Sequence, residues 1–196
     1  MGAHDFLAVT DDIRAAERGS RWGLPGEEPL REERLPFTVK AVRSDEELSK
    51  AVYIRRSAYA RHMPEFAKTL CLPEPLDRDE GSVVLLAESK LDGSPVGSLR
   101  LQSNRQGKLC LERSVELPAW LQDRSLAEGT RLAISEGSAG RLVKAALIKA
   151  FYLYCLEWRI YWIIITARRP LDRQYEALLY QDVFPGGDFI PMQHIG

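Results

Sequence analysis

The sequence predicts one α/β (α+β) domain built on a mixed sheet that helices flank. The chain has 196 residues, 45% of them hydrophobic, which is enough for one full core and too little for two. Segments with the apolar period of strands alternate with segments that have the period of helices. A glycine-rich loop at residues 137–140 joins a strand to the most strongly amphipathic helix, residues 141–158.

The first 36 residues are expected to form an arm that packs on a domain of residues 37–196. This segment is rich in charge, Gly and Pro, yet it carries more apolar residues, Phe6 and Trp22 among them, than a free tail would. One helix is expected within it, over residues 11–18.

The elements of the domain follow from apolar spacing and from turn residues. Ser44 is expected to cap the first helix, which Pro64 ends or kinks. The loop at 137–140 could offer free backbone amides to a phosphate or a carbonyl oxygen, although glycine is also common at ordinary helix starts. In chain order we expect strands at 37–42, 83–89, 95–102 and 108–113, a short helix at 117–122, a strand at 125–134, the helix at 141–158, a strand at 161–167 and a last helix at 172–181.

Composition excludes several classes of protein. Lys and Arg total 27 against 28 Asp and Glu, so the charge gives no reason to expect nucleic acid as the partner. Apolar runs such as residues 161–165 are far below the roughly 20 residues of a membrane helix. The first residues lack a basic segment followed by an apolar one, so a cytoplasmic location is expected.

The cysteines and histidines are scattered, with no spacing typical of metal ligands or of a disulfide framework. We expect reduced, packed thiols and no metal. These residues are Cys71, Cys110, Cys155, His4, His62 and His194.

Four short motifs occur in the order seen in autoinducer synthases. They are IRRSAY at 54–59, LDRD at 76–79, VGSLRL at 96–101 and LAEGTRL at 126–132. Over roughly residues 37–190 the chain looks closer to relatives of that family, the long-chain N-acyl amino acid synthases that make N-acyltyrosine. The resemblance implies a GNAT-like fold with a mostly antiparallel sheet. It also implies an acyl carrier protein, whose phosphopantetheine carries a fatty acyl chain as donor, and a free amino acid, tyrosine or another aromatic, as acceptor.

The resemblance also implies which residues form the site. Position 65 is Glu and position 66 is Phe, where the autoinducer synthases have a tryptophan nearby, which argues against a lactone product. The matching substrate-binding positions are Arg55, Tyr59, Asp77, Asp79, Arg100 and Arg131, and the matching carboxylate for catalysis is Glu128.

Amide formation from a thioester requires a neutral amine, a donor for the developing oxyanion and release of the thiol. Glu128 is the candidate base, directly or through a water. It shares a sheet face with Arg131 only if a bulge, which Gly129 could mark, lies between them. The alternative is that the matched carboxylates and arginines form an ion-pair network that shapes the site. The arginines could also hold the acceptor's carboxylate, Arg131 first and Arg100 second.

The donor is expected to be carrier-bound phosphopantetheine. Ile134 lies three residues before Gly137, where CoA-dependent relatives usually carry Arg or Gln. Residues 137–173 have an excess of five positive charges, so Arg141 and Lys144 are candidates to dock an acidic carrier, although each could equally lie on a solvated helix face.

A long acyl chain requires an apolar lining, because each buried methylene contributes about 0.8 kcal/mol. Each candidate could instead be plain core. The candidates to bind acyl chain or pantetheine are Leu99, Leu101, Leu132, Ile134, Gly137, Phe151, Tyr154, Trp158 and Ile164.

Four functions therefore remain after the sequence is read. The first is the N-acyl amino acid synthase. The others are an acyl homoserine lactone synthase, a CoA-dependent N-acetyltransferase that needs no apolar tunnel, and a lipid-binding module without turnover.

Overall fold

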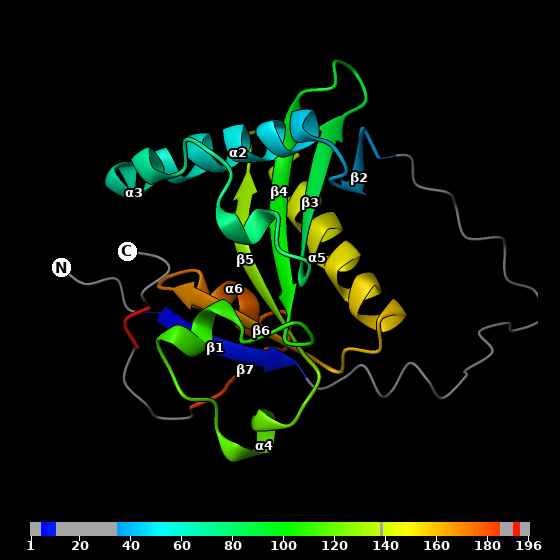
Figure 1. The fold of residues 1–196 in the computed structure, drawn as a ribbon. Coiled ribbons are helices and arrows are strands. Elements are labelled where there is room, and N and C mark those ends of the chain that lie inside the picture. Colours follow the sequence, from blue (N-terminus) through cyan, green and yellow to red (C-terminus); the bar gives the residue numbers. More distant parts are fainter. Residues whose placement is uncertain (1–4, 11–34, 138, 185–189, 193–196) are drawn as a thin grey trace, which may run out of the picture.

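A computed structural model describes residues 5–10, 35–137, 139–184 and 190–192. It shows a seven-stranded sheet in the order β2-β3-β4-β5-β6-β1-β7 (Figure 1). Neighbouring strands are antiparallel except β5 and β6, whose parallel pairing requires the crossover that α5 provides. The predicted mixed, mostly antiparallel sheet is confirmed. The elements are β1 (Asp5–Thr10), β2 (Phe37–Ala41), α2 (Asp45–Ala60), α3 (Pro64–Thr69), η1 (Pro75–Asp77), β3 (Ser82–Ser89), β4 (Pro95–Ser103), η2 (Cys110–Arg113), α4 (Ala119–Gln122), β5 (Leu126–Ile134), α5 (Gly140–Glu157), β6 (Trp162–Arg168), α6 (Asp172–Glu176) and β7 (Gln181–Asp182).

Local signals placed the first helix correctly. Ser44 caps α2, and its Oγ accepts a hydrogen bond of 3.2 Å from the backbone N–H of Glu47. Helix α2 ends at Ala60, and Pro64 begins the separate helix α3.

The strand expected at 108–113 is wrong, because this segment contains the 3₁₀ helix η2. Its alternating leucines, Leu109 and Leu111, do both point into the core. Their backbone N–H groups donate to side chains, however, at 2.7 Å to Glu112 Oε2 and at 3.1 Å to Glu128 Oε2. The segment therefore lies over the sheet and is not part of it.

The elements near the two ends of the chain also differ from those expected. Helix α6 stops at Glu176, and Gln181 belongs to strand β7. Strand β1, which was not predicted, pairs antiparallel with β6. The helix expected at 11–18 lies outside the described residues, and the division into arm and domain stays a prediction.

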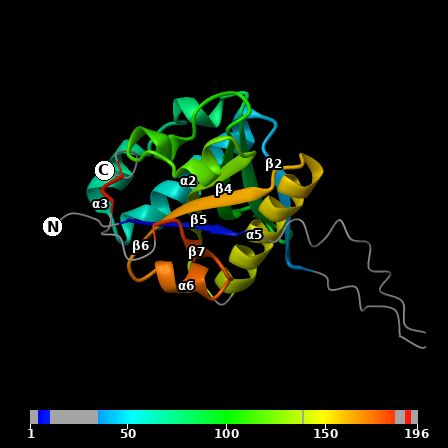
Figure 2. The same cartoon turned by 90° about the horizontal axis from the view of Figure 1, so that it is seen from below.

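Helices α2 and α5 cover opposite faces of the sheet (Figure 2). Along β3, Val84 and Leu86 pack in a cluster with residues of α2, while Leu85 and Ala87 pack in the larger cluster that includes α5. The face toward α2 carries the polar site described below.

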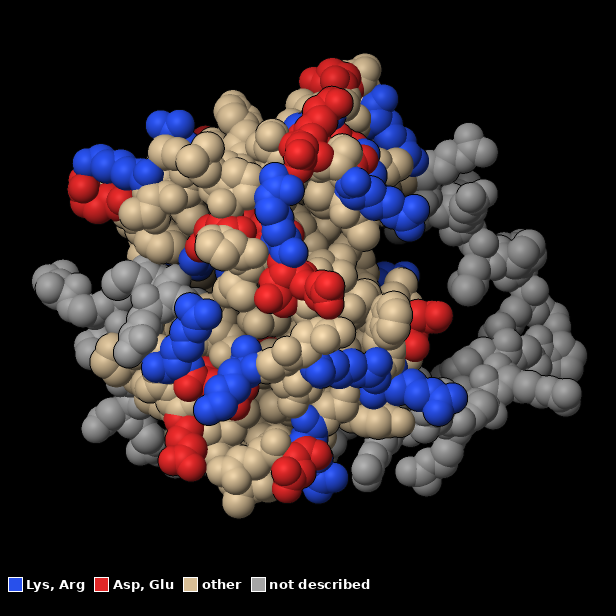
Figure 3. Space-filling model, in the orientation of Figure 1, with Lys and Arg blue, Asp and Glu red and all other residues tan. Residues whose placement is uncertain are grey.

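Lys and Arg side chains are interspersed with Asp and Glu over the face seen in Figure 3. This mixture agrees with the near-zero net charge of the chain. Within the described ranges, every helix is too short or too polar to cross a bilayer.

Helix α5 approaches β4 closely at Gly97. A Cβ atom at this position would lie 2.6 Å from Cγ1 of Val143 and 3.0 Å from Cδ1 of Leu147. Both partners are fully buried, so neither has room to move.

Gly97→Ala should therefore destabilise the fold by about 1–3 kcal/mol, the usual cost of overpacking a core. Adding Val143→Ala should recover part of the loss, because it removes the clashing methyl groups. Urea unfolding measures both effects. Gly140→Ala is the control, since a Cβ there meets its nearest neighbours at 3.4 Å and should be tolerated. Unchanged stability of Gly97→Ala would contradict the packing.

Candidate functional site

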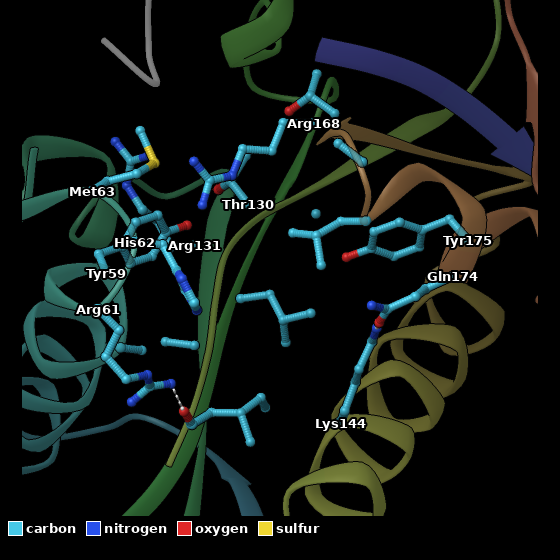
Figure 4. Close-up of a pocket in the computed structure, with 18 residues that line it drawn as sticks. Tyr59, Arg61, His62, Met63, Thr130, Arg131, Lys144, Arg168, Gln174 and Tyr175 are labelled. Atoms are coloured by element: carbon cyan, nitrogen blue, oxygen red, sulfur yellow. Dashed lines mark hydrogen bonds between the residues drawn. The ribbon is translucent and has the colours of Figure 1, made fainter. Parts of the chain in front are cut away.

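A pocket of about 280 Å³ opens where β5 and β6 stop pairing. The parallel ladder ends at Gly129 and Ile165, and the residues that follow in both strands line the pocket. In Figure 4, the end of α2 forms one wall, and α5 and α6 form the other. The lining residues are Ala58, Tyr59, Arg61, His62, Met63, Gly129, Thr130, Arg131, Leu132, Ala133, Ile134, Lys144, Thr166, Ala167, Arg168, Leu171, Gln174 and Tyr175.

Strand β5 contains a bulge at the pocket. Ser98 pairs with Ala133 and Arg100 pairs with Thr130, so two residues of β5, Arg131 and Leu132, lie opposite a single residue of β4. Arg131 adopts the left-handed conformation, with φ of 57°. The bulge turns its side chain to the face toward α2, so that Arg131 and Glu128 share this face.

The bulge lies beyond Gly129, which keeps regular pairing with Leu101. Gly129 has a different role. A Cβ atom there would lie 2.9 Å from Cε1 of Phe151, so the glycine leaves space for this ring of α5. The bulge expected at Gly129 is therefore wrong, and the bulge at Arg131 and Leu132 is the one that brings Arg131 to the face of Glu128.

Three arginines and two carboxylates form a network on the same face. Arg55 Nη1 donates to Asp77 Oδ1 at 2.7 Å, and Arg100 Nη1 contacts Asp77 Oδ1 at 3.2 Å and Glu74 Oε2 at 3.0 Å. Arg131 binds Glu74 in bidentate fashion, with Nε to Oε2 at 2.7 Å and Nη2 to Oε1 at 2.6 Å. The network joins α2, the η1 loop, β4 and β5.

Glu74 was not among the residues that sequence reasoning selected. It lies just before the matched motif at 76–79, and its spacing from Asp77 was the available signal. The two residues form a capping box around Pro75, in which the N–H of Glu74 donates to Asp77 Oδ2 at 2.9 Å. Burial alone would raise its pKa, but the hydrogen bonds and the charge of Arg131, with the charges of Arg100 and Arg55, lower the pKa of Glu74 to about 2.

Asp79 lies outside this network. Its Oδ1 accepts a hydrogen bond of 2.8 Å from the backbone N–H of Gly81, and the residue is exposed. It holds the turn before β3.

Glu128 is fully buried and does not line the pocket, although the next residues of β5 do. Its Oε2 accepts from the N–H of Leu111 at 3.1 Å. Burial raises the pKa of Glu128 to about 7, against the opposing effect of the backbone N–H groups of Leu111 and Cys110. A carboxyl group with this pKa can exchange a proton near neutral pH.

The wall at the end of α2 carries aromatic and basic side chains (Figure 4). Tyr59 lines the pocket and packs edge-to-face on Phe66 at 5.4 Å, and Phe66 also lies 4.9 Å from the guanidinium of Arg131. Arg61 Nη2 donates to the carbonyl oxygen of Ile134 at 2.8 Å. Phe66 therefore packs against the arginine that the bulge turns toward α2.

The structure divides the acyl-chain candidates. Leu132 and Ile134 line the pocket, whereas the others lie elsewhere. Gly137, with φ of 128°, lies in the loop before α5. Leu99, Leu101 and Phe151 pack in the core toward α5, Ile164 packs in the core beside η2, and Tyr154 and Trp158 lie together at the C-terminal end of α5.

The two residues predicted to dock the carrier lie in different environments. Arg141 is exposed at the start of α5. Lys144 lines the pocket, where its Nζ contacts Gln174 Oε1 at 2.5 Å and lies 5.2 Å from the centre of the Tyr175 ring.

Within the described residues, no three or more His, Cys, Asp or Glu side chains lie close enough together to hold a metal ion. Cys110 and Cys155 are buried free thiols, and Cys71 is exposed.

Comparison with known proteins shows a family and a fold to which the chain is similar. A family model described as N-acyl amino acid synthase FeeM matches residues 46–189. The structure of FeeM, an N-acyl amino acid synthase from uncultured soil microbes, is similar at 20% identity and a TM-score of 0.62, covering 79% of this chain and 86% of that one. An acetyltransferase from Trypanosoma brucei is similar at 15% identity and a TM-score of 0.52, covering 74% and 92%. A predicted acetyltransferase with acetyl-CoA from Clostridium acetobutylicum is similar at 13% identity and a TM-score of 0.52, covering 74% and 90%. No curated protein sequence matches the chain. The structural likeness confirms the expected GNAT-like fold.

Glu74→Gln should destabilise the protein by about 3–5 kcal/mol, because it leaves two buried guanidinium groups without their shared carboxylate. The pKa of Glu74 is lowered on folding, so its contribution is present above about pH 4.5 and is lost as the pH falls toward 2. Chemical unfolding at pH 7 and pH 3 should show a smaller difference between wild type and variant at the lower pH. Asp79→Asn, on the same loop but outside the network, is the matched control. Equal effects of the two substitutions would contradict the proposed role of Glu74.

Proposed function

Because the chain belongs to the FeeM family of N-acyl amino acid synthases, we propose that it transfers a long-chain fatty acyl group from acyl carrier protein to the α-amine of an amino acid, tyrosine or another aromatic. That it is an acyltransferase of GNAT-like fold follows from the family and the fold. The finer assignment of donor and acceptor is the proposal, and the composition of the pocket supports it.

The charge of the pocket carries the proposal for the acceptor. Four cationic side chains line it and, within the described residues, no carboxylate does. An amino acid, and the N-acyl amino acid made from it, each bring a carboxylate that such a pocket favours. The rings of Tyr59 and Tyr175 offer an aromatic acceptor surfaces to pack on.

The loop before α5 supports a donor without a nucleotide. Ile134 offers no charged or polar side chain at the position where CoA-dependent relatives hold the pyrophosphate. Ala139, at the N-cap of α5, makes no side-chain capping bond, so a single phosphate can take amides of the first turn other than that of Gly140, which donates to the carbonyl of Gly137. Arg141 is exposed beside this loop, and its positive charge supports docking of an acidic carrier.

The reaction joins the amine nitrogen to the thioester carbon and breaks the carbon–sulfur bond. Glu128 takes the amine proton through a water in this proposal, because its pKa of about 7 suits a base near neutral pH. Its side chain lies on the same strand face as Thr130, which lines the pocket two residues further along β5. The thiolate of the phosphopantetheine leaves and regains a proton.

The proposed donor is tested by offering the purified protein the same fatty acyl group on acyl carrier protein and on CoA. With tyrosine as acceptor, we expect mass spectrometry to detect N-acyltyrosine and kcat/KM to be higher with the carrier. Equal or faster turnover with acyl-CoA would overturn the choice of donor. Acetyl-CoA serves as the control for a small-group acetyltransferase, and it should give no product.

Glu128→Gln should lower turnover by about 100-fold, the typical contribution of a general base, while the fold persists. The loss should shrink at high pH, where the free amine forms without help. A pH–rate profile and a thermal melt of the variant are the measurements. If Glu128 only supports η2, the variant should instead lose stability and keep the wild-type pH profile. A stable and fully active variant would exclude both roles.

A further inference from the structure

Lys144 is an unusual member of the pocket wall. It belongs to the second turn of α5, and its ammonium lies against Gln174 and Tyr175 of the α6 segment (Figure 4). Its side chain is half-buried, and burial lowers its pKa. The structure shows no ion pair between Lys144 and any carboxylate of the described ranges.

Two of the other three cationic residues of the pocket have protein partners that Lys144 lacks. Arg131 gives its bidentate bonds to Glu74. Arg61 donates to the carbonyl of Ile134 and lies 3.5 Å from Glu136. Arg168, the last residue of β6, also lines the pocket and forms no ion pair within the described residues. Lys144 is therefore a cation that the fold turns into the pocket without supplying a carboxylate for it.

Taking a cation out of water costs free energy unless an anion or strong acceptors replace the water. The side-chain oxygen of Gln174 supplies one such acceptor, and an anionic ligand would supply the charge. In the proposed reaction the candidates are the carboxylate of the acceptor and the phosphate of the donor. Lys144 lies four residues beyond Gly140, about 6 Å along the helix from the end where a phosphate would bind.

We propose, on the basis of the proposed function, that the Lys144 ammonium binds the α-carboxylate of the acceptor amino acid and so selects amino acids over simple amines. The neighbouring Gln174 holds the ammonium in place. Lys144 would thus be a residue of the acceptor site, inside the pocket, and not a contact for the carrier protein.

The test compares Lys144→Met, which keeps the length of the side chain and removes its charge, with Lys144→Arg, which keeps the charge. Lys149→Met, exposed on the same helix, is the matched control. In Lys144→Met, we expect KM for tyrosine to rise about tenfold or more, the effect of losing a hydrogen bond to a charged group. KM for the acylated carrier should stay unchanged. Lys144→Arg should recover part of the affinity, and Lys149→Met should behave as wild type.

A second arm uses tyrosinamide, which has the amine and no carboxylate. The wild type should prefer tyrosine, and Lys144→Met should accept both equally. A rise in KM for the carrier with unchanged KM for tyrosine would overturn the inference and assign Lys144 to the donor phosphate. Unchanged constants for both substrates, or a preserved preference for tyrosine, would also overturn it.

A binding measurement separates this inference from the proposed function. Calorimetric titration of the wild type with N-dodecanoyl tyrosine and with its methyl ester requires no turnover. Tighter binding of the free acid, lost in Lys144→Met, supports the carboxylate site even if another donor is used. Equal binding of acid and ester by the wild type would overturn it. Absence of N-acyltyrosine from the turnover assay, together with this binding preference, would count against the proposed function alone.

Discussion

The bidentate pair between Glu74 and Arg131 is the interaction on which the site depends. Arg131 has a backbone conformation that a non-glycine residue rarely adopts, and such strain persists only where surrounding contacts fix it. Its two hydrogen bonds to Glu74 supply that constraint. Glu74 also contacts Arg100, so one carboxylate anchors the η1 loop to both β4 and β5. The bulge, which follows the last pairing of β5 with β6 at Gly129, is thereby held in place beside the pocket.

The same network shows how the fold keeps charge where it is needed. Three guanidinium groups share two carboxylates, and Arg55 and Arg100 are each only 1% exposed. Neutralising most of this charge within the protein makes burial tolerable, because each unpaired ion would cost several kcal/mol. The remaining excess of positive charge lies beside the pocket and favours an anionic ligand.

How far the sequence leads depends on whether a signal is local. The Ser44 cap, the alternation along β3 and β4 and the amphipathic α5 are local, and each was placed correctly within a residue or two. Leu109 and Leu111 show the same alternation as a strand. Their backbone N–H groups instead bind two carboxylates, Glu112 in the same turn and Glu128, which is distant in the sequence. Strand β1 exists through pairing with β6, which lies more than 150 residues away, and no short window contains that information.

The candidate site shows the same limit in its side chains. The resemblance selected Arg55, Asp77, Arg100, Glu128 and Arg131, and the fold brings these residues together on the side of the sheet that faces α2. It could not show that Glu74 completes their pairing or that Asp79 turns away, because both outcomes depend on the path of one loop. Nor could it distinguish Leu132, which lines the pocket, from Leu99 and Leu101, which are buried in the core. The difference arises because β4 lies between two strands, whereas β5 loses its pairing with β6 beyond Gly129.

These features give the two walls of the pocket different tasks. On the α2 wall the charges are largely satisfied by the protein, so their main effect is to fix the shape of β5 and the positions of Tyr59 and Thr130. On the α5 and α6 wall, Lys144 has polar neighbours and no protein carboxylate within the described residues. The residues that carry the family resemblance are thus mostly those that build the site, because building it requires several partners in fixed order along the chain. Lys144 lies outside those motifs. The charge excess of residues 137–173 assigned it to a surface that docks the carrier, because a count of charges does not show which way a side chain turns, and the structure turns it into the pocket.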